Sequence, residues 1–249
     1  MRTVVVSGGG TGIGRAVALR FAADGEQVVL IGRRAEVLDR VVVEIASRHP
    51  GAPAAVAVAA DLTEPAQAER VAGRIGSVDV VVNSAGGNAL MSAPPDVPEG
   101  IAGVAWHWVE NFRLNTLTAV LLTEALRGRI ADGGRVVLLS SIAAYRGSGS
   151  GSYGGSKAAL HPYAYDMAAA LGPRGITVNV VAPGYIADTE FFKGGMSPER
   201  EEVLVGQTHT GRAGTPADVA ETVAWLASAG AAHATGQVVQ VNGGAERGR

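Results

Sequence analysis

The feature that most constrains the fold of this chain is a regular alternation of short β-branched apolar runs with longer amphipathic stretches. Most of the short runs are apolar throughout rather than alternating with polar residues. Continuous apolar runs are typical of strands that are buried on both faces of a parallel sheet. The predicted strands are Thr3–Ser7, Gln27–Ile31, Ala54–Ala59, Asp79–Asn83, Gly134–Ser141, Ile176–Val181 and Gln237–Val241.

The longer stretches carry apolar residues at helical spacing. Strand and helix in regular alternation predict an α/β fold, a doubly wound Rossmann sheet of parallel strands with helices on both faces. No linker-like segment or internal repeat divides the chain, so we expect one domain over residues 1–249. The predicted helices are Gly12–Ala23, Ala35–Arg48, Glu64–Ile75, Trp106–Leu126, Tyr153–Leu171 and Thr215–Ala227, and Pro162 should kink the fifth of them.

Composition excludes several classes of function. The net charge of −2 argues against a basic nucleic-acid face. The chain has no cysteine and its histidines lie far apart, so we expect no metal site. No stretch approaches the roughly 18 apolar residues of a membrane span. We therefore expect a cytoplasmic protein without a nucleic-acid or membrane partner.

A glycine-rich turn follows the first predicted strand and opens the first predicted helix. Its glycines allow a sharp turn and bring backbone N–H groups close to a phosphate at a helix N-terminus. A glycine triplet alone is a weak signal, but this strand-to-helix context is the one that a dinucleotide-binding turn requires. The predicted cofactor contacts here are Gly8, Thr11, Gly12, Ile13 and Gly14.

The second predicted strand ends without the acidic residue that NAD-specific sites place on the adenosine ribose. It runs instead into Gly32-Arg33-Arg34. A guanidinium can bind a 2′-phosphate through two charge-assisted hydrogen bonds. These arginines favour NADP(H), although solvated arginines at a helix start would look the same. NAD(H) therefore stays open as an alternative.

Tyr153 and Lys157 are four residues apart and share one face of a predicted helix. A free tyrosine has a pKa of about 10, and a cation close by lowers the pKa by roughly 1–3 units. This pair predicts a phenol that transfers a proton at neutral pH. Ser140 and Ser141 end the preceding strand, where a hydroxyl can hold a substrate oxygen beside that phenol.

Taken together, these motifs resemble the single-domain branch of the short-chain dehydrogenase/reductase family, including its 3-oxoacyl–acyl-carrier-protein reductases. The similarity extends from one end of the chain to the other. Besides the glycine turn, it rests on Asp61-Leu62, Asn83-Ser84-Ala85-Gly86, Asn115, Ser141, Tyr153, Lys157, Val178–Gly184 and Val241–Gly244.

The resemblance implies a catalytic tetrad. In it, Tyr153 exchanges a proton with the substrate oxygen, and Lys157 lowers the pKa of that phenol and binds the nicotinamide ribose. Ser141 orients the substrate oxygen, and Asn115 positions a water that relays protons. Asn83 is also expected to cap its strand through hydrogen bonds to the backbone. The further cofactor contacts that the family implies are Asp61, Leu62, Asn83, Ala85, Gly86, Tyr153, Lys157, Pro183, Gly184 and Ile186.

Some positions depart from the family pattern. Ser141 lies one residue closer to Tyr153 than in many relatives, so Ser140 stays open as the substrate-orienting serine. Asp188 stands where the family often has a threonine near the nicotinamide, and Thr189 follows it. We expect His161 to lie at the surface or at a subunit interface.

The expected activity is hydride transfer between NADP(H) and a small carbonyl or alcohol substrate, most simply reduction of a ketone or 3-oxoacyl group. Arg127 and Arg129 could meet an acidic acyl-carrier protein, or simply be solvated. The alternatives are an NADP-binding redox sensor without catalysis, and an NAD-dependent alcohol dehydrogenase of a sugar or steroid.

A long segment near residues 184–214 is expected to act as a lid over the substrate. Its apolar candidates are Tyr185, Phe191, Phe192 and Met196. We also expect a homotetramer, with a dimer as the alternative. The helix that holds Asn115 and the C-terminal strand are expected to contribute to its interfaces, together with a surface formed by Ala158, Ala159, Leu160, Tyr163, Met167 and Ala168.

Overall fold

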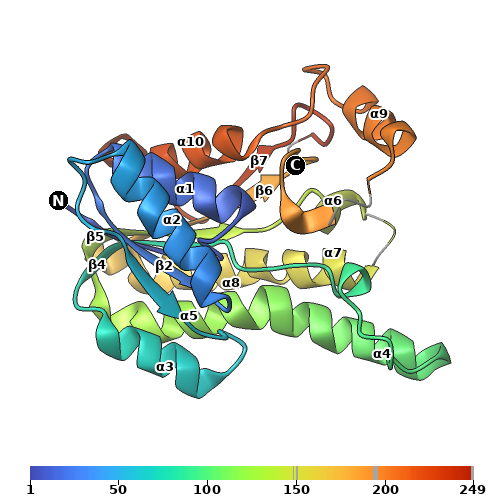
Figure 1. Cartoon of the computed structure of the whole chain (residues 1–249), viewed down its shortest axis with the longest axis horizontal. Helices are drawn as coiled ribbons and strands as arrows, with labels where there is room; N and C mark the ends of the chain where they lie inside the picture. Colours follow the sequence, from blue (N-terminus) through green and yellow to red (C-terminus); the bar gives the residue numbers. More distant parts are fainter. Residues whose placement is uncertain (148, 150, 193–195, 248–249) are drawn as a thin grey trace.

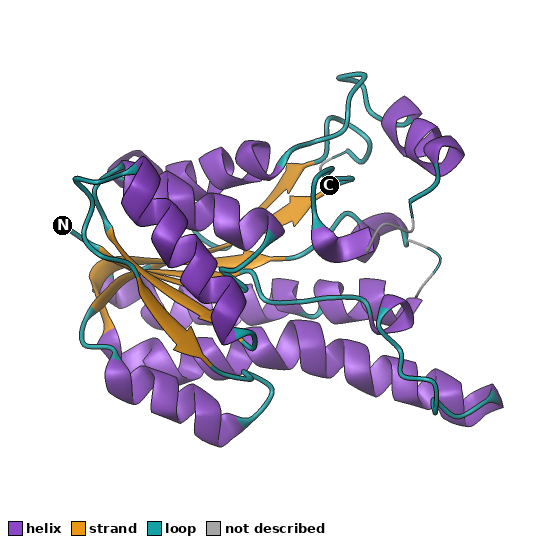
Figure 2. Cartoon of the chain, in the orientation of Figure 1, coloured by secondary structure: helices purple, strands orange, loops and turns teal. Residues whose placement is uncertain are grey.

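Seven parallel strands form one sheet in the order β3-β2-β1-β4-β5-β6-β7 in the computed structural model of the chain. The structure describes residues 1–147, 149, 151–192 and 196–247. Figure 2 shows the sheet between two layers of helices, as the sequence predicted. The strands are β1 (Thr3–Ser7), β2 (Gln27–Gly32), β3 (Val56–Ala59), β4 (Val78–Asn83), β5 (Ile130–Leu139), β6 (Thr177–Pro183) and β7 (Val238–Val241).

The helices lie in two groups that cover opposite faces of the sheet (Figure 1). One group packs α1, α2 and α10 onto one face, and α3, α5 and α8 pack onto the other. The helices are α1 (Gly12–Ala23), α2 (Ala35–Arg48), α3 (Pro65–Arg74), α4 (Gly100–Asn111), α5 (Thr118–Leu126), α6 (Ala143–Arg146), α7 (Gly151–Ala158), α8 (Leu160–Leu171), α9 (Pro198–Gly206) and α10 (Pro216–Leu226).

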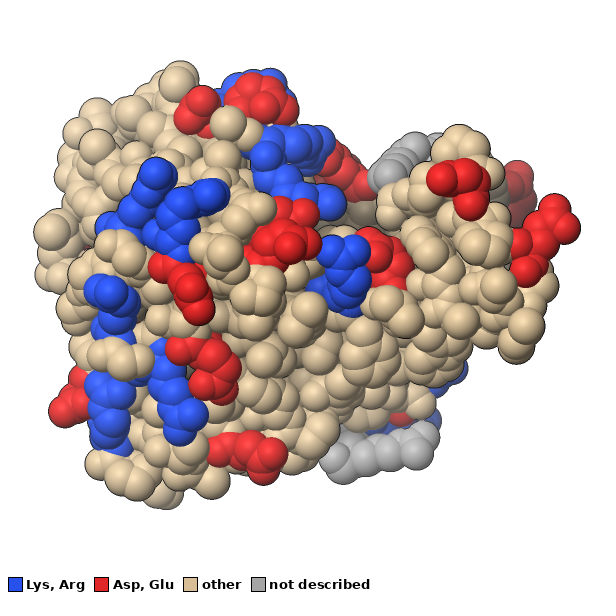
Figure 3. All heavy atoms as spheres, turned by 90° about the horizontal axis from the view of Figure 1, so that it is seen from below, with Lys and Arg blue, Asp and Glu red and all other residues tan. Residues whose placement is uncertain are grey.

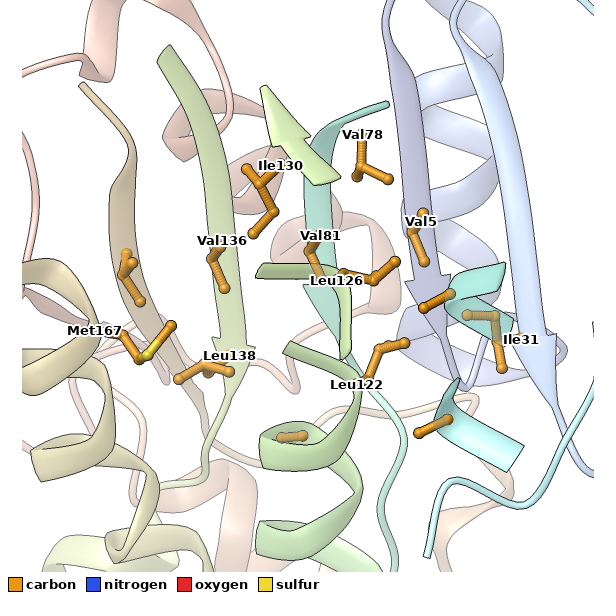
Figure 4. Close-up of a cluster of buried hydrophobic side chains, with 14 of the residues drawn as sticks. Val5, Ile31, Val78, Val81, Leu122, Leu126, Ile130, Val136, Leu138 and Met167 are labelled. Atoms are coloured by element: carbon orange, nitrogen blue, oxygen red, sulfur yellow. The ribbon is translucent and has the colours of Figure 1, made fainter. Parts of the chain in front are cut away.

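Each central strand feeds two hydrophobic cores, because successive side chains of a strand point to opposite faces. Val4 and Val6 pack under α1 and α10, whereas Val5 belongs to the cluster with Leu122 and Leu126 of α5. Figure 4 shows this second cluster between β1, β4, β5 and the helices below them. A strand between two such layers must be apolar at every position, which explains the continuous runs in the sequence.

Some predicted helix and strand boundaries agree with the structure, and others differ from it. Helices α1 and α2 have the predicted bounds. The predicted helix from Trp106 starts earlier, at Gly100, and contains a π-helical turn, Phe112–Leu117. Strand β5 ends at Leu139, so both candidate serines lie just beyond it.

The helix predicted from Tyr153 to Leu171 is interrupted at Ala159, between α7 and α8. Pro162 explains the break, since it has no N–H to donate to the carbonyl of Ala158 one turn earlier. The predicted disturbance of this helix by Pro162 is seen as this one-residue interruption. It lies only two residues after Lys157.

The strand order reverses direction between β1 and β4, which are neighbours in the sheet although they are not consecutive in the chain. Open α/β sheets bind ligands at such a switch point, beyond the carboxyl ends of the strands. The glycine turn follows β1, Gly86 follows β4, Ser141 follows β5 and Gly184 follows β6. The predicted site residues therefore gather along one edge of the sheet.

Charged side chains are distributed unevenly over the molecule. On the face seen in Figure 3, Lys and Arg are interspersed with Asp and Glu, and a wide area carries neither. In the described part of the chain, no helix combines the length and apolar character needed to cross a membrane.

Candidate active site

The glycine turn is too tight for side chains at two of its positions. A Cβ at Gly14 would overlap the carbonyl of Gly8, and a Cβ at Gly8 would lie 2.9 Å from the backbone of Ala85. Gly8 and Gly12 also have positive φ angles of 66° and 49°. Ser7 Oγ accepts hydrogen bonds from the amides of Ser84 and Ala85, so the ends of β1 and β4 are tied together.

A cavity of about 380 Å³ opens beside this turn and is lined by Gly10, Thr11 and Gly12. Thr11 precedes α1 without capping it through its side chain, and the first turn of α1 has no acidic residue. The first N–H groups of a helix have no partners within the helix and attract anions. The turn therefore fits the diphosphate of a dinucleotide.

The two arginines after β2 differ in their contacts. Arg34 precedes α2, and its Nη2 donates to Oε2 of Glu190 at 2.8 Å. Glu190 lines the same cavity, from the segment after β6. Among the described residues, Arg33 forms no ion pair, and its side chain is exposed. At least one guanidinium thus stands free at the end of β2.

Tyr153 is buried, with 8% of its surface exposed, and the side chain of Ser141 lies close enough to its phenol to act on the pKa. Burial raises the pKa of Tyr153 to about 12, and the hydrogen bond from Ser141 opposes that rise. Of the two serines left open by the sequence, the structure brings Ser141 to the phenol. The hydroxyl of Ser140 instead contacts the main-chain carbonyl of Lys157 and the imidazole of His161.

Lys157 is buried as well, and its Nζ donates to the main-chain carbonyl of Leu139 at 2.8 Å. Burial lowers the pKa of Lys157 to about 8. The prediction that Lys157 makes the phenol acidic is wrong for this arrangement, since the ammonium is held at the end of β5 while desolvation dominates at Tyr153.

Asn115 lies in the π-helical turn and is completely engaged. Its Oδ1 accepts from the amide of Gly87, and its Nδ2 donates to Gly87 O, Asn111 O and Ser156 Oγ. A Cβ at Gly86 would lie 2.6 Å from this Oδ1 and 3.0 Å from Nζ of Lys157. Gly86, Asn115 and Lys157 therefore converge, and π-helical turns are frequent at functional sites.

Other predicted cofactor residues point elsewhere. Asn83 donates to Oγ1 of Thr123 on α5, so its side chain joins β4 to that helix; the expected strand cap is not formed in the described residues. Leu62 and Ile186 are buried in the two cores, and only their main chains could reach a ligand. The carboxylate of Asp61 accepts from the amide and hydroxyl of Thr63. Gly184, next to Pro183, packs against Asn242.

The segment after β6 crosses the site from the glycine turn to the tyrosine. A Cβ at Gly12 would lie 3.4 Å from the methyl group of Thr189. Asp188 before it has a φ of 55°, in the left-handed region that side chains rarely adopt. Phe191 of a 3₁₀ turn, η5 (Glu190–Phe192), packs its ring 5.5 Å from that of Tyr153.

The predicted lid near residues 184–214 is not a plain loop. It contains η5 and α9, and a bridge between Ile186 and Gly214 joins its two ends. Phe192 contacts both Phe191 and Tyr185, so three of the four apolar candidates form one aromatic cluster. Residues 193–195 lie outside the described residues.

Two surface predictions can be compared with the burial of their residues. His161 is half-buried and lies 2.9 Å from Ser140 Oγ through its Nε2, a contact that sequence spacing did not reveal. Half of the proposed interface residues are interior, since Leu160, Met167 and Ala168 belong to the core, whereas Ala158, Ala159 and Tyr163 are partly exposed.

Arg127 and Arg129 lie where β5 begins, and the candidate active site lies where it ends. Strand β5 pairs with β4 from Val78 to Asn83, so about 20 Å separate the two at the usual rise. Arg129 donates to the carbonyl of Ile75, and Arg127 pairs with Glu124. Within one chain, these arginines do not border the site.

Residues 8–246 match the family described as enoyl-(acyl carrier protein) reductase. The 3-oxoacyl-[acyl-carrier-protein] reductase FabG of Pseudomonas aeruginosa is 34% identical over 249 residues, which cover 98% of this chain and 96% of that protein. The chain belongs to the short-chain dehydrogenase/reductase family.

Solved short-chain dehydrogenases/reductases share the fold. A short-chain dehydrogenase from Burkholderia cenocepacia in complex with NADP superposes with a TM-score of 0.84 at 29% identity, covering 98% of this chain and 97% of that one. A 7α-hydroxysteroid dehydrogenase with NADH and a 7-oxo bile acid gives 0.84 and 29%, covering 98% and 93%. The family members to which this chain is similar are therefore oxidoreductases, and they differ from one another in substrate and cofactor.

Proposed function

We propose that this chain is an NADP(H)-dependent reductase that converts a ketone or 3-oxoacyl group to the secondary alcohol, with Tyr153 as the proton donor. One observation carries this proposal: Ser141 lies beside the buried phenol of Tyr153 and acts on its pKa. Lys157 is on the same helix as Tyr153, and its Nζ donates to Leu139 O at the end of β5. A carbonyl oxygen held between the two hydroxyls would receive two hydrogen bonds as negative charge develops on it.

The protonation state of Tyr153 fits its proposed role as the proton donor. A phenol whose pKa is raised to about 12 is protonated at neutral pH. It is therefore ready to donate to a carbonyl oxygen, and it would need deprotonation before it could accept a proton from an alcohol. The cofactor, when bound, supplies the hydride.

Lys157 and Asn115 have supporting roles in this proposal. With a pKa of about 8, Lys157 can exchange a proton close to neutral pH. Its Nζ is near Gly86 and can turn from Leu139 O to a ribose hydroxyl. Asn115, held by hydrogen bonds on both sides of its amide, keeps the segment after β4 in place. A water bound beside it would connect Lys157 to solvent.

The cofactor assignment rests on the glycine turn and the arginines after β2. The remaining family positions, including Thr11, Ile13, Asp61, Ala85, Pro183 and Ile186, are proposed as further contacts. Arg33 and Arg34 favour a 2′-phosphate. Because solved relatives carry NADP in one case and NADH in another, NAD(H) is the alternative that binding measurements must exclude.

The aromatic rings beside Tyr153 favour a substrate with an apolar body. Phe191 contacts Tyr153 directly and is supported by Phe192. The segment near 184–214 would close over such a substrate as a lid. An acyl chain or a cyclic ketone would fit this surface. Docking of a carrier protein through Arg127 and Arg129 has no support within one chain, since they lie at the opposite edge of the sheet.

The test is a comparison of wild-type protein with Tyr153→Phe. NADPH absorbance is followed while ketones, aldehydes and 3-oxoacyl thioesters are added. The variant should lose about 10²–10⁴-fold in rate while the Kd for NADPH stays the same. Tyr165→Phe on α8 is the matched control, since its exposed ring has no role in the proposal. A Tyr153→Phe protein with wild-type turnover would refute the mechanism, and a wild type that reduces none of these compounds would favour the non-catalytic sensor.

We also propose that the chain folds as one domain and that four copies of it assemble into a homotetramer. Val109, Phe112 and Leu117 are exposed on the helix that contains Asn115, as are Ile101, Val104 and Trp108 nearer its start. Burying such a stripe against a second copy would stabilise the assembly. Sedimentation of a stable monomer at micromolar concentration would contradict this.

A further inference from the structure

Glu190 connects two parts of the site that are far apart in the chain. Its Oε2 accepts from Nη2 of Arg34 at 2.8 Å, across 156 positions of sequence. The residue before it, Thr189, lies against Gly12 of the phosphate-binding turn. The residues that follow β6 thus occupy both places where a dinucleotide would have its phosphates, the diphosphate at Gly12 and the 2′-phosphate at Arg34.

We propose that Glu190 sets the cofactor selectivity of this chain by competing with the 2′-phosphate of NADP(H) for Arg34. The proposal rests on the proposed function only in taking Arg34 as a 2′-phosphate residue. A phosphate that binds Arg34 must take the guanidinium from the carboxylate. NAD(H) has no such phosphate and leaves the pair intact.

The strength of the pair is suited to competition. The two side chains are 55% and 61% exposed. Exposed ion pairs of this kind are weak, because water screens both charges. A phosphate with nearly two negative charges and three acceptor oxygens is a stronger partner for a guanidinium than a carboxylate. The 2′-phosphate would therefore win, but with reduced affinity.

The surrounding charges give the phosphate little further help. The cavity beside the turn is lined by the carboxylates of Glu44, Asp188 and Glu190 and by Arg15 and Arg40. Arg15 is already bound to Glu44. Removing the charge of Glu190 should consequently change the affinity for a 2′-phosphate much more than the affinity for the rest of the nucleotide.

Binding of nucleotide fragments to the whole chain tests this without catalysis. We expect Glu190→Gln to tighten the Kd for 2′,5′-ADP by roughly 2- to 6-fold, since it removes a competitor from an exposed ion pair. The Kd for 5′-AMP should stay within about twofold. Glu202→Gln on α9 removes the same charge from an exposed position of the same segment and should change neither value.

A double variant tests whether Glu190 acts on 2′,5′-ADP binding through Arg34. In an Arg34→Ala background, Glu190→Gln should lose most of its influence on 2′,5′-ADP, because there is no shared guanidinium. Unchanged 2′,5′-ADP binding in Glu190→Gln would overturn the proposal. Weaker binding would overturn it too, and would make the pair a strap over the bound cofactor.

These outcomes are separable from those of the proposed function. If Arg34→Ala weakens 2′,5′-ADP binding and Glu190→Gln does nothing, only the role of Glu190 fails. If wild-type protein binds 5′-AMP as tightly as 2′,5′-ADP and gains nothing from Glu190→Gln, the NADP(H) assignment fails with it. The proton transfer by Tyr153 is tested by neither experiment.

Discussion

Nε2 of His161 lies 2.9 Å from the hydroxyl oxygen of Ser140, and that hydroxyl donates to the main-chain carbonyl of Lys157. Because the single proton of the hydroxyl goes to Lys157, the imidazole must donate through Nε2. The contact spans the helix break that Pro162 causes at Ala159. It therefore holds the end of α7, and with it Lys157, against the end of β5.

Removing this link should disturb the lysine. Ser140→Ala leaves buried polar groups without a partner, which should cost about 1–3 kcal/mol of unfolding free energy, and it should lower kcat more than it raises KM. His161→Gln, with an amide donor, should retain more activity than His161→Ala. Denaturation and steady-state kinetics test this, with exposed Ser77→Ala as the control. Equal activity in both His161 variants would mean that the hydrogen bond does not position Lys157.

Gly86 and Gly87 make a matched pair for testing the convergence of Asn115 and Lys157. A Cβ at Gly86 would lie 2.6 Å from Asn115 Oδ1, whereas a Cβ at Gly87 would have nothing within 4 Å. Gly86→Ala must therefore push the amide or the ammonium aside, and displacements of this size can cost up to about 10²-fold in rate. Gly87→Ala should leave kcat within about twofold. Two variants with the same kcat would show that these atoms need no exact placement.

Phe191 shields the phenol of Tyr153, and burial is the main cause of the raised pKa there. Phe191→Ala should bring water to the phenol and lower its pKa from about 12 toward 10. The pH dependence of kcat/KM for alcohol oxidation reports this group and should move to lower pH. Phe192→Ala, which removes a ring that contacts Phe191, should shift the profile less. An unmoved profile in Phe191→Ala would mean that other groups desolvate the phenol.

Burial of Lys157 makes stability depend on pH. Its pKa is about 8 in the folded chain against 10.5 for an unperturbed lysine. Between these values the unfolded chain binds more protons, so stability rises with pH, and this gain is absent below about pH 8. Tyr153 acts in the opposite direction, but only above pH 10, where an unperturbed tyrosine starts to ionise. Urea denaturation at pH 8 and pH 9.5 should show a rise for wild type that Lys157→Met lacks; parallel curves would place Lys157 in contact with water.

The sequence predicted those features of the fold that depend on neighbours in the chain. The bounds of α1 and α2 follow from helical spacing of apolar residues, and the central strands follow from runs without a polar residue. The glycine turn was predictable because its steric demand is local: Gly8 and Gly14 contact each other. The spacing of Tyr153 and Lys157 placed both on one helix, and Pro162 predicted the break.

The chemistry of the site was decided by tertiary contacts. Lys157 Nζ goes to Leu139 O, 18 positions away, and Arg34 meets Glu190 across 156 positions. The direction of the Tyr153 pKa is set by what covers the phenol, including Phe191. Spacing along a helix tells which side chains share a face, because the backbone fixes that geometry. Which partner each polar group finds, and how much water it loses, depends on elements that only the packed sheet brings together.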